Sequence, residues 1–183
     1  MKRKINLTVI IALVALVGFS SCDKLKDKLF VSFVASTAAV PFTINEITTI
    51  NTQFDLGLLS QRVNLDSLIK DQTGNAFGLD DIKSINLEEV VITILNPDPA
   101  NNVANFEQGN LIFATNTSPS PVIVASGLNP DVYAESWNMP VDKTINLADH
   151  LKGTQLLYVL SGRARRVTTK KLNCQMVVKF KVN

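Results

Sequence analysis

The sequence predicts an all-β protein, a single antiparallel β-sandwich with one or two short helical turns. Three observations lead to this fold class. Short runs rich in Val, Ile, Thr and Phe recur along the chain, clusters of Pro, Asn, Asp and Ser separate them, and no long amphipathic helical pattern occurs. Many short strands without long helices are typical of a sandwich. The pattern leaves a jelly-roll and an immunoglobulin-like strand order equally open.

Ten segments are expected to form strands, and turn clusters such as Asn-Pro-Asp-Pro at 96–99 and Asn-Pro-Asp at 129–131 separate several of them. Their Val, Ile, Thr and Phe content favours a pleated, half-buried surface. The expected strands, in chain order, are 30–36, 40–47, 52–58, 87–95, 111–115, 122–126, 132–137, 144–147, 155–161 and 172–182.

The last segment, 172–182, carries the clearest strand pattern, because apolar side chains occupy every second position and mostly polar ones lie between them. Cys174 lies on the apolar face, so we expect a small buried thiol rather than a reactive one. The chain has only one other cysteine, Cys22, and we expect no disulfide framework.

Two segments far apart in the chain echo each other: Val63-Asn-Leu-Asp-Ser-Leu-Ile-Lys and Ile145-Asn-Leu-Ala-Asp-His-Leu-Lys. In each, two apolar residues four positions apart would share one face of a helical turn. Such turns could plug the two ends of the sandwich. The echo fits either an internal duplication or a local solution that recurs, and we favour the second.

Length and charge limit the number of domains and the classes of partner. The chain from Cys22 to Asn183 is long enough for one domain with a single core. The segment before Cys22 holds three of the 18 basic side chains and none of the 16 acids, so the remainder has a net charge of −1. No basic field favours nucleic acid as a partner.

The start of the chain, MKRKINLTVIIALVALVGFSSC, has the order of an export signal: a basic start, an apolar run over 9–17 and small residues before Cys22. The run is too short for a transmembrane helix, which needs about 20 apolar residues. Phe19-Ser20-Ser21-Cys22 resembles the lipobox of bacterial lipoproteins in its Bacteroidota-type form. An ordinary secretory signal is the alternative, but the segment lacks a good small-x-small cleavage site.

The resemblance implies cleavage before Cys22 and a diacylglycerol on its thiol, which divides the chain into a signal peptide (1–21), a lipidated tether (22–28) and the sandwich (29–183). It implies a lipid-anchored envelope protein, at the outer membrane. The tether stretch DKLKDK holds three lysines and two acids. Bacteroidota-type surface-export tethers are acidic, so the periplasmic face is favoured over the cell surface.

We expect the sandwich to act as a binding or envelope-structural module, with a glycan or an envelope protein as its partner and no cofactor. One alternative is an adhesin or fimbria-associated surface subunit, and another is a glycan or ester hydrolase. Catalysis has little support in the sequence, because the only histidine, His150, has no nucleophile motif beside it. We therefore expect no enzyme, and a solvated His150.

Acidic residues suggest two further candidates. Asp80-Asp81 and Glu88-Glu89 could be imagined as a glycosidase couple, but 16 acids make such pairs inevitable. The loop 96–102 offers Asp98 and amide oxygens to a calcium ion, yet it lacks the density of a calcium-binding loop. We expect no metal site.

The strongest binding candidate is a basic hairpin between the last two strands, with two more lysines on the solvent face of the final strand. Convergent cations would attract headgroup phosphates or an acidic glycan. The alternative is that these cations protect an edge strand from aggregation. The hairpin residues are Arg163, Arg165, Arg166, Lys170 and Lys171, and the strand residues are Lys179 and Lys181.

Two smaller candidates complete the set. Tyr133, Glu135 and Trp137 would share one face of an extended chain and form a sugar platform, although core packing of the only tryptophan is the favoured alternative. Asp66-Ser67-Leu68 resembles the O-glycosylation sequon of exported Bacteroidota-type proteins, with Ser67 as the acceptor. Otherwise Asp66 simply begins a helical turn.

Overall fold

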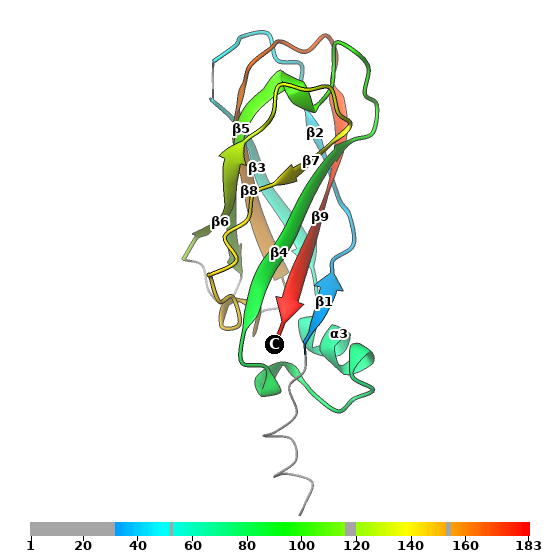
Figure 1. The fold of residues 1–183 in the computed structure, drawn as a ribbon, viewed down its shortest axis with the longest axis vertical. Helices are drawn as coiled ribbons and strands as arrows, with labels where there is room; N and C mark the ends of the chain where they lie inside the picture. Colours follow the sequence, from blue (N-terminus) through cyan, green and yellow to red (C-terminus); the bar gives the residue numbers. More distant parts are fainter. Residues whose placement is uncertain (1–31, 52, 116–119, 153–154) are drawn as a thin grey trace, which may run out of the picture. The chain divides into compact units, whose positions relative to one another are not determined.

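The computed structural model describes residues 32–51, 53–115, 120–152 and 155–183. The predicted signal peptide, Cys22 and the tether lie outside the described residues. The described strands form two antiparallel sheets, called here sheet A and sheet B (Figure 1). Sheet A contains β1 (Phe33–Ser36), β2 (Val40–Ile44), β4 (Ile85–Ile94), β7 (Ser136–Met139) and β9 (Leu172–Val182). Sheet B contains β3 (Gln53–Arg62), β5 (Phe106–Thr115), β6 (Val122–Leu128) and β8 (Gln155–Ala164).

The strand pairs are nested like one long hairpin that has been rolled up. β1 and β2 pair with β9, β3 with β8, β4 with β7, and β5 with β6, and the orders are β1-β9-β4-β7 and β3-β8-β5-β6. β1 and β2 occupy one side of β9 as a single interrupted strand. This is the strand order of a jelly roll. The prediction of an all-β sandwich is confirmed, and the immunoglobulin-like order is excluded.

Two strand predictions were wrong over most of their length, and two others were wrong at one end, since β2 ends at Ile44 and β5 begins at Phe106. Residues 144–147 form a loop, because the carboxylate of Asp142 accepts hydrogen bonds from the amide and the hydroxyl of Thr144 (2.9 and 2.6 Å). Such a side chain offers the backbone an alternative to a strand ladder. The predicted strand 132–137 begins only at Ser136.

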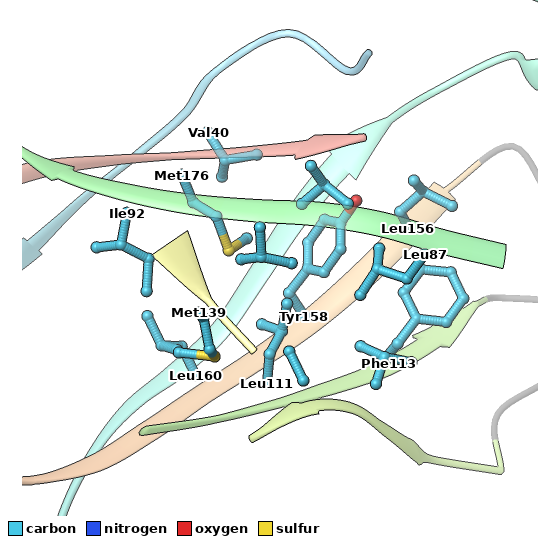
Figure 2. Close-up of a cluster of buried hydrophobic side chains, with 14 of the residues drawn as sticks. Val40, Leu87, Ile92, Leu111, Phe113, Met139, Leu156, Tyr158, Leu160 and Met176 are labelled. Carbon is cyan, nitrogen blue, oxygen red and sulfur yellow. The ribbon is translucent and has the colours of Figure 1, made fainter. Parts of the chain in front are cut away.

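The hydrophobic core lies between the two sheets. Figure 2 shows side chains of both sheets interleaving, with Leu87, Ile92 and Met176 from sheet A and Leu111 and Tyr158 from sheet B among the labelled residues. The alternation predicted for 172–182 is confirmed, since every second residue of β9 is buried.

Both echo motifs close the same end of the sandwich. The first forms helix α3 (Leu65–Gln72), which Asn64 caps by accepting from the amide of Ser67 (3.0 Å). In the second, which runs into the 3-10 helix η3 (His150–Lys152), Asn146 accepts from the amide of Ala148 (3.0 Å). The expectation that they plug opposite ends was wrong, because the connections β3 to β4 and β7 to β8 emerge at one end of a jelly roll. Their buried residues are Leu65, Ile69, Leu147 and Leu151.

The C-terminus lies at this closed end, at the bottom of Figure 1. Ser32 is there too, since its hydroxyl donates to the side-chain oxygen of Asn183 (3.0 Å). From this end β9 extends back for about 34 Å, at about 3.4 Å per residue. Among the described residues, no helix is both long enough and apolar enough to span a membrane.

Candidate functional site

Four connections gather at the opposite end of the sandwich, at the top of Figure 1. We call this the loop end, and it consists of residues 45–51, 95–105, 129–135 and 165–171. Backbone hydrogen bonds join neighbouring connections directly: Thr168 donates to Ile47 (3.0 Å), Arg165 to Asn105 (2.7 Å) and Val103 to Ala134 (3.0 Å).

Buried asparagines hold these loops together. The amide group of Asn105 donates to the carbonyls of Ala100 (2.9 Å) and Val167 (2.7 Å), while its oxygen accepts from the backbone of Asn102 (3.0 Å). Asn129 donates to the carbonyl of Val103 (2.6 Å). Both side chains are almost fully buried, so their polar atoms cannot bond to water, and these hydrogen bonds satisfy them instead. The loop predicted as a weak calcium candidate is part of this network.

The basic hairpin lies at the loop end, but most of its charge is neutralised. Arg163 pairs with Glu107 (2.8 Å), Arg166 with Asp131 (2.6 Å) and Lys170 with Asp98 (2.6 Å). Arg165 donates to the carbonyls of Asn129 (2.9 Å) and Ala104 (3.2 Å) and lies 3.6 Å from Asp131. Of the five cations, Lys171 alone makes no ion pair with the described residues. The hairpin thus fastens loops together more than it forms a free positive field.

The alternative reading of these cations as edge protection was wrong. β8 lies between β3 and β5, and β9 lies between the β1/β2 strand and β4, so neither is an edge strand. On the outer face of sheet A, Lys179 pairs with Glu89 at 2.5 Å. Lys181 is exposed.

The carboxylate of Asp98 makes the stability of the loop end depend on pH. The ammonium group of Lys170 and the amide of Asn101 lower the pKa of Asp98 from 3.8 to about 2. Because the folded-state pKa is lowered, the carboxylate stabilises the fold fully above pH 3.8, and this contribution is lost as the pH falls toward about 2.

We therefore expect the thermal midpoint to fall in this acid range, and to fall less in Asp98→Asn, which has no carboxylate to protonate. Circular dichroism melts between about pH 5 and pH 2 measure this. Asp80→Asn, which removes an exposed carboxylate outside the loop end, should behave like the wild type. An Asp98→Asn midpoint that falls as steeply as the wild-type midpoint would contradict the assignment.

The predicted sugar platform is not formed. Trp137 is 8% exposed and packs in the core, as the alternative reading predicted, whereas Tyr133 is 52% exposed. Glu135 is exposed, and neither it nor Tyr133 belongs to a strand. The three side chains therefore do not share a face. The reason is that β7 begins at Ser136, so the alternation expected from Tyr133 onward does not hold.

Exposed apolar side chains concentrate at the loop end instead. Eight large hydrophobic residues of the described chain are exposed, and five of them lie in the four connections. A sixth, Leu128, is the last residue of β6 and directly precedes one of the connections. A concentration of exposed apolar side chains at one end of a domain favours an interaction site there. The five are Ile50, Leu95, Val132, Tyr133 and Val167, and the remaining two are Val34 and Ile123.

A groove runs along β7 into the loop end. Its volume is about 410 Å³, within the range of small-ligand and peptide sites. Apolar side chains dominate its lining, and we call it the β7 groove. It is lined by Val103, Leu128, Asn129, Pro130, Val132, Ala134, Ser136, Trp137, Asn138 and Pro140. Nine of these ten residues lie in the single stretch 128–140, and Val103 alone comes from elsewhere in the chain. Sequence reasoning missed the groove, because the pattern of residues 128–140 does not show how that stretch folds back beside β7.

Two glycines allow the groove wall to approach sheet B closely. Gly127 and Gly109 are register partners across β6 and β5. A Cβ on Gly109 would lie 2.8 Å from the ring of Trp137, and one on Gly127 would lie 2.6 Å from Pro140. Only glycine leaves room for these contacts.

The acidic candidates have partners within the fold. Glu88 pairs with Lys143 (2.6 Å), as Glu89 does with Lys179, and the carboxylate of Asp81 accepts from the amide of Gly78 (2.8 Å). Asp80 is exposed. Within the described residues, no three His, Cys, Asp or Glu side chains gather closely enough to hold a metal ion.

The remaining candidates lie away from the loop end or inside the core. His150 is half-buried, with its ring 6.4 Å from that of Phe113, so the expectation of a solvated histidine was wrong. Cys174 is buried as predicted, and burial raises the pKa of its thiol to about 12. Ser67 is exposed on α3, at the closed end.

No protein-family model matches this chain, and no curated protein matches it. Among solved structures, it is similar to a chain of the Gx strain of infectious bursal disease virus, with a TM-score of 0.38 and 10% identity over 82% of this chain. It spans 32% of that viral chain. It is also similar to a chain of Desmodium yellow mottle tymovirus, with a TM-score of 0.26 and 11% identity over 84% of this chain and 89% of that one.

Proposed function

We propose that this chain is an exported bacterial lipoprotein, anchored through lipid on Cys22, whose jelly-roll domain binds an envelope partner with its loop end. The observation that carries the proposal is the place where the described chain begins. Ser32 hydrogen-bonds to Asn183 at the closed end, so the segment that follows Cys22 joins the domain at the end opposite the loop end.

The surface of the loop end supports binding rather than a passive role. Exposed apolar side chains protrude from every one of its four connections. The buried asparagines and the paired cations fix these connections relative to one another. A rigid surface loses little conformational entropy when a partner binds, which favours affinity.

The same geometry refines the idea of an anionic ligand for Arg163, Arg165, Arg166, Lys170 and Lys171. These cations lie about 34 Å along β9 from the closed end, where the described chain begins. With four of the five already bound to carboxylates or carbonyls, apolar contact is the stronger basis for recognition.

We place the proposed lipoprotein at the outer membrane, and the composition of the tether favours its periplasmic face. A diacyl or triacyl anchor would hold the protein at the membrane, since each buried methylene contributes about 0.8 kcal/mol. The partner would then be another protein or a glycan of the envelope.

Labelling of cells with a clickable palmitate analogue tests the anchor. The wild type should be labelled and Cys22→Ala should lose all label, because Cys22 would be the only acylated thiol. Cys174→Ala is the matched control and should keep the full label, since Cys174 is buried within β9. Equal labelling of the wild type and Cys22→Ala would refute the proposal.

A further inference from the structure

We propose that the β7 groove binds an extended peptide segment of a partner protein, which adds a strand to the free edge of β7. The segment is apolar at alternate positions and carries a lysine or arginine. This inference rests on the proposed function and names the kind of partner that the loop end recognises.

The backbone of β7 offers the first argument. Its partner strand is β4, and the amide of Ile94 donates to the carbonyl of Glu135 (2.9 Å). Bonding alternates along an antiparallel pair, so Trp137 also faces β4, while the amides and carbonyls of Ser136 and Asn138 face away from it. Ser136 and Asn138 line the groove. An extended peptide would bond to these outward groups, as in strand addition.

The walls and ends of the groove supply the second argument. Leu128 and Val132 are 69% and 66% exposed, and they stand beside the outward backbone groups. At one end the groove is closed, because the carbonyl of Pro140 accepts from the amide of Ser126 (3.0 Å). A segment lying here must therefore be short, and its apolar side chains would cover surface that is now exposed to water.

Charge supplies the third argument. Glu135 lies between the groove residues Ala134 and Ser136, is exposed, and makes no ion pair with the described residues. Asp131, near the other wall, is already paired with Arg166. Glu135 does not itself line the groove, but its exposed carboxylate lies on the segment that does, which favours a basic residue in the bound segment and disfavours acidic lipid headgroups.

The other sheet edges are less suited to accept a strand. β2 carries Pro41, which has no amide to donate, and the interruption between β1 and β2 breaks the ladder. Part of the outer edge of β6 is occupied, since the chain beyond β7 bonds to it at Val124 and Ser126. On β3, Arg62 is exposed, and a charged edge resists pairing.

The test uses a chain from Asp23 to Asn183, which contains all described residues, and a soluble probe peptide, acetyl-Lys-Thr-Val-Thr-Val-Thr-Lys-amide. Titration followed by ¹⁵N NMR measures affinity, and amide hydrogen exchange locates the contact. We expect slower exchange at the amides of Ser136 and Asn138. The amides of Trp137 and Met139 already face β4 and should not change. A peptide with serine in place of valine should not bind.

Ser136→Pro is the decisive variant, because it removes one outward amide while leaving the bonds of β7 to β4 in place. It should weaken peptide binding about tenfold or more, as expected for loss of a backbone bond and a blocked edge. Ser136→Ala, the matched control, loses the same hydroxyl contact to Thr93 but keeps the amide, and should bind like the wild type.

Leu128→Asp tests the wall independently and should also weaken binding, whereas Val34→Asp, a similar change on β1, should not. No binding by the wild type at about 1 mM peptide, or full binding by a folded Ser136→Pro, would overturn the inference. So would exchange protection confined to another edge. If the peptide does not bind but Cys22 is labelled normally, the groove inference is wrong and the anchor proposal stands. If the peptide binds but the wild type is not labelled, the anchor proposal is wrong and the groove inference stands.

Discussion

Replacing Trp137 by alanine is expected to destabilise the domain by about 3–5 kcal/mol, the usual loss for a large aromatic residue removed from a core. Its side chain is 8% exposed and packs against Gly109, among residues of both sheets. Urea unfolding at neutral pH measures the free energy of unfolding. Tyr133→Ala, a change to the exposed aromatic residue of the same segment, should alter this free energy by less than about 0.5 kcal/mol.

A double-mutant cycle with Gly109 sharpens this expectation. A Cβ on Gly109 would lie 2.8 Å from the Trp137 ring, so Gly109→Ala should cost about 1–3 kcal/mol in the wild type. In the Trp137→Ala background the ring is absent and the remaining close contact, at 2.9 Å, is with the flexible end of Met139, so the same substitution should cost less. Additive effects, or equal effects of Trp137→Ala and Tyr133→Ala, would show that Trp137 does not pack as described.

Asn105→Ala is expected to destabilise the domain by about 3 kcal/mol, because each buried polar group left unsatisfied costs about 1–3 kcal/mol, partly relieved where water can enter. The substitution removes two donated hydrogen bonds and one accepted bond, and it leaves three backbone groups at the loop end without their partner. Urea unfolding measures the change in the free energy of unfolding.

The matched control is Asn173→Ala, because Asn173 is exposed on β9 and its backbone bonds would be unaffected. It should change the free energy of unfolding by less than about 0.5 kcal/mol. If Asn105→Ala matched this control, the asparagine network would not be what holds the loops. Hydrogen exchange offers a second readout, since Asn105→Ala should speed exchange at Val103 and Arg165, whose amides bond within the loop end.

Much of the local structure could be predicted from the sequence, because it depends on neighbours in the chain. The alternation in 172–182 predicted both the strand and the burial of Cys174. The pattern Val-Asn-Leu predicted a helical turn, which Asn64 caps. Segment 144–147 failed because the side chain of Asp142 bonds to Thr144, a competing interaction that apolar periodicity does not report.

The candidate site was only partly predictable. The cations of the basic hairpin and Tyr133 were singled out and lie at or next to the loop end, but the partners of the cations were not visible in the sequence. Arg163 meets Glu107 across 56 positions of the chain. The loop 96–102 was considered as a source of calcium ligands, whereas the amide of Asn101 donates to the carboxylate of Asp98 and to the hydroxyl of Thr169 in another loop.

By itself, then, the sequence determined the fold class, most strand segments and the buried face of the last strand, and it predicts the export signal on which the proposed lipid anchor rests. Each of these depends on residue types within a few positions of one another. The tertiary structure alone decided the jelly-roll order, the placement of both echo motifs at one end and the existence of the β7 groove. These depend on pairing between segments far apart in the chain, where many registers satisfy the same local pattern and only packing in three dimensions selects one.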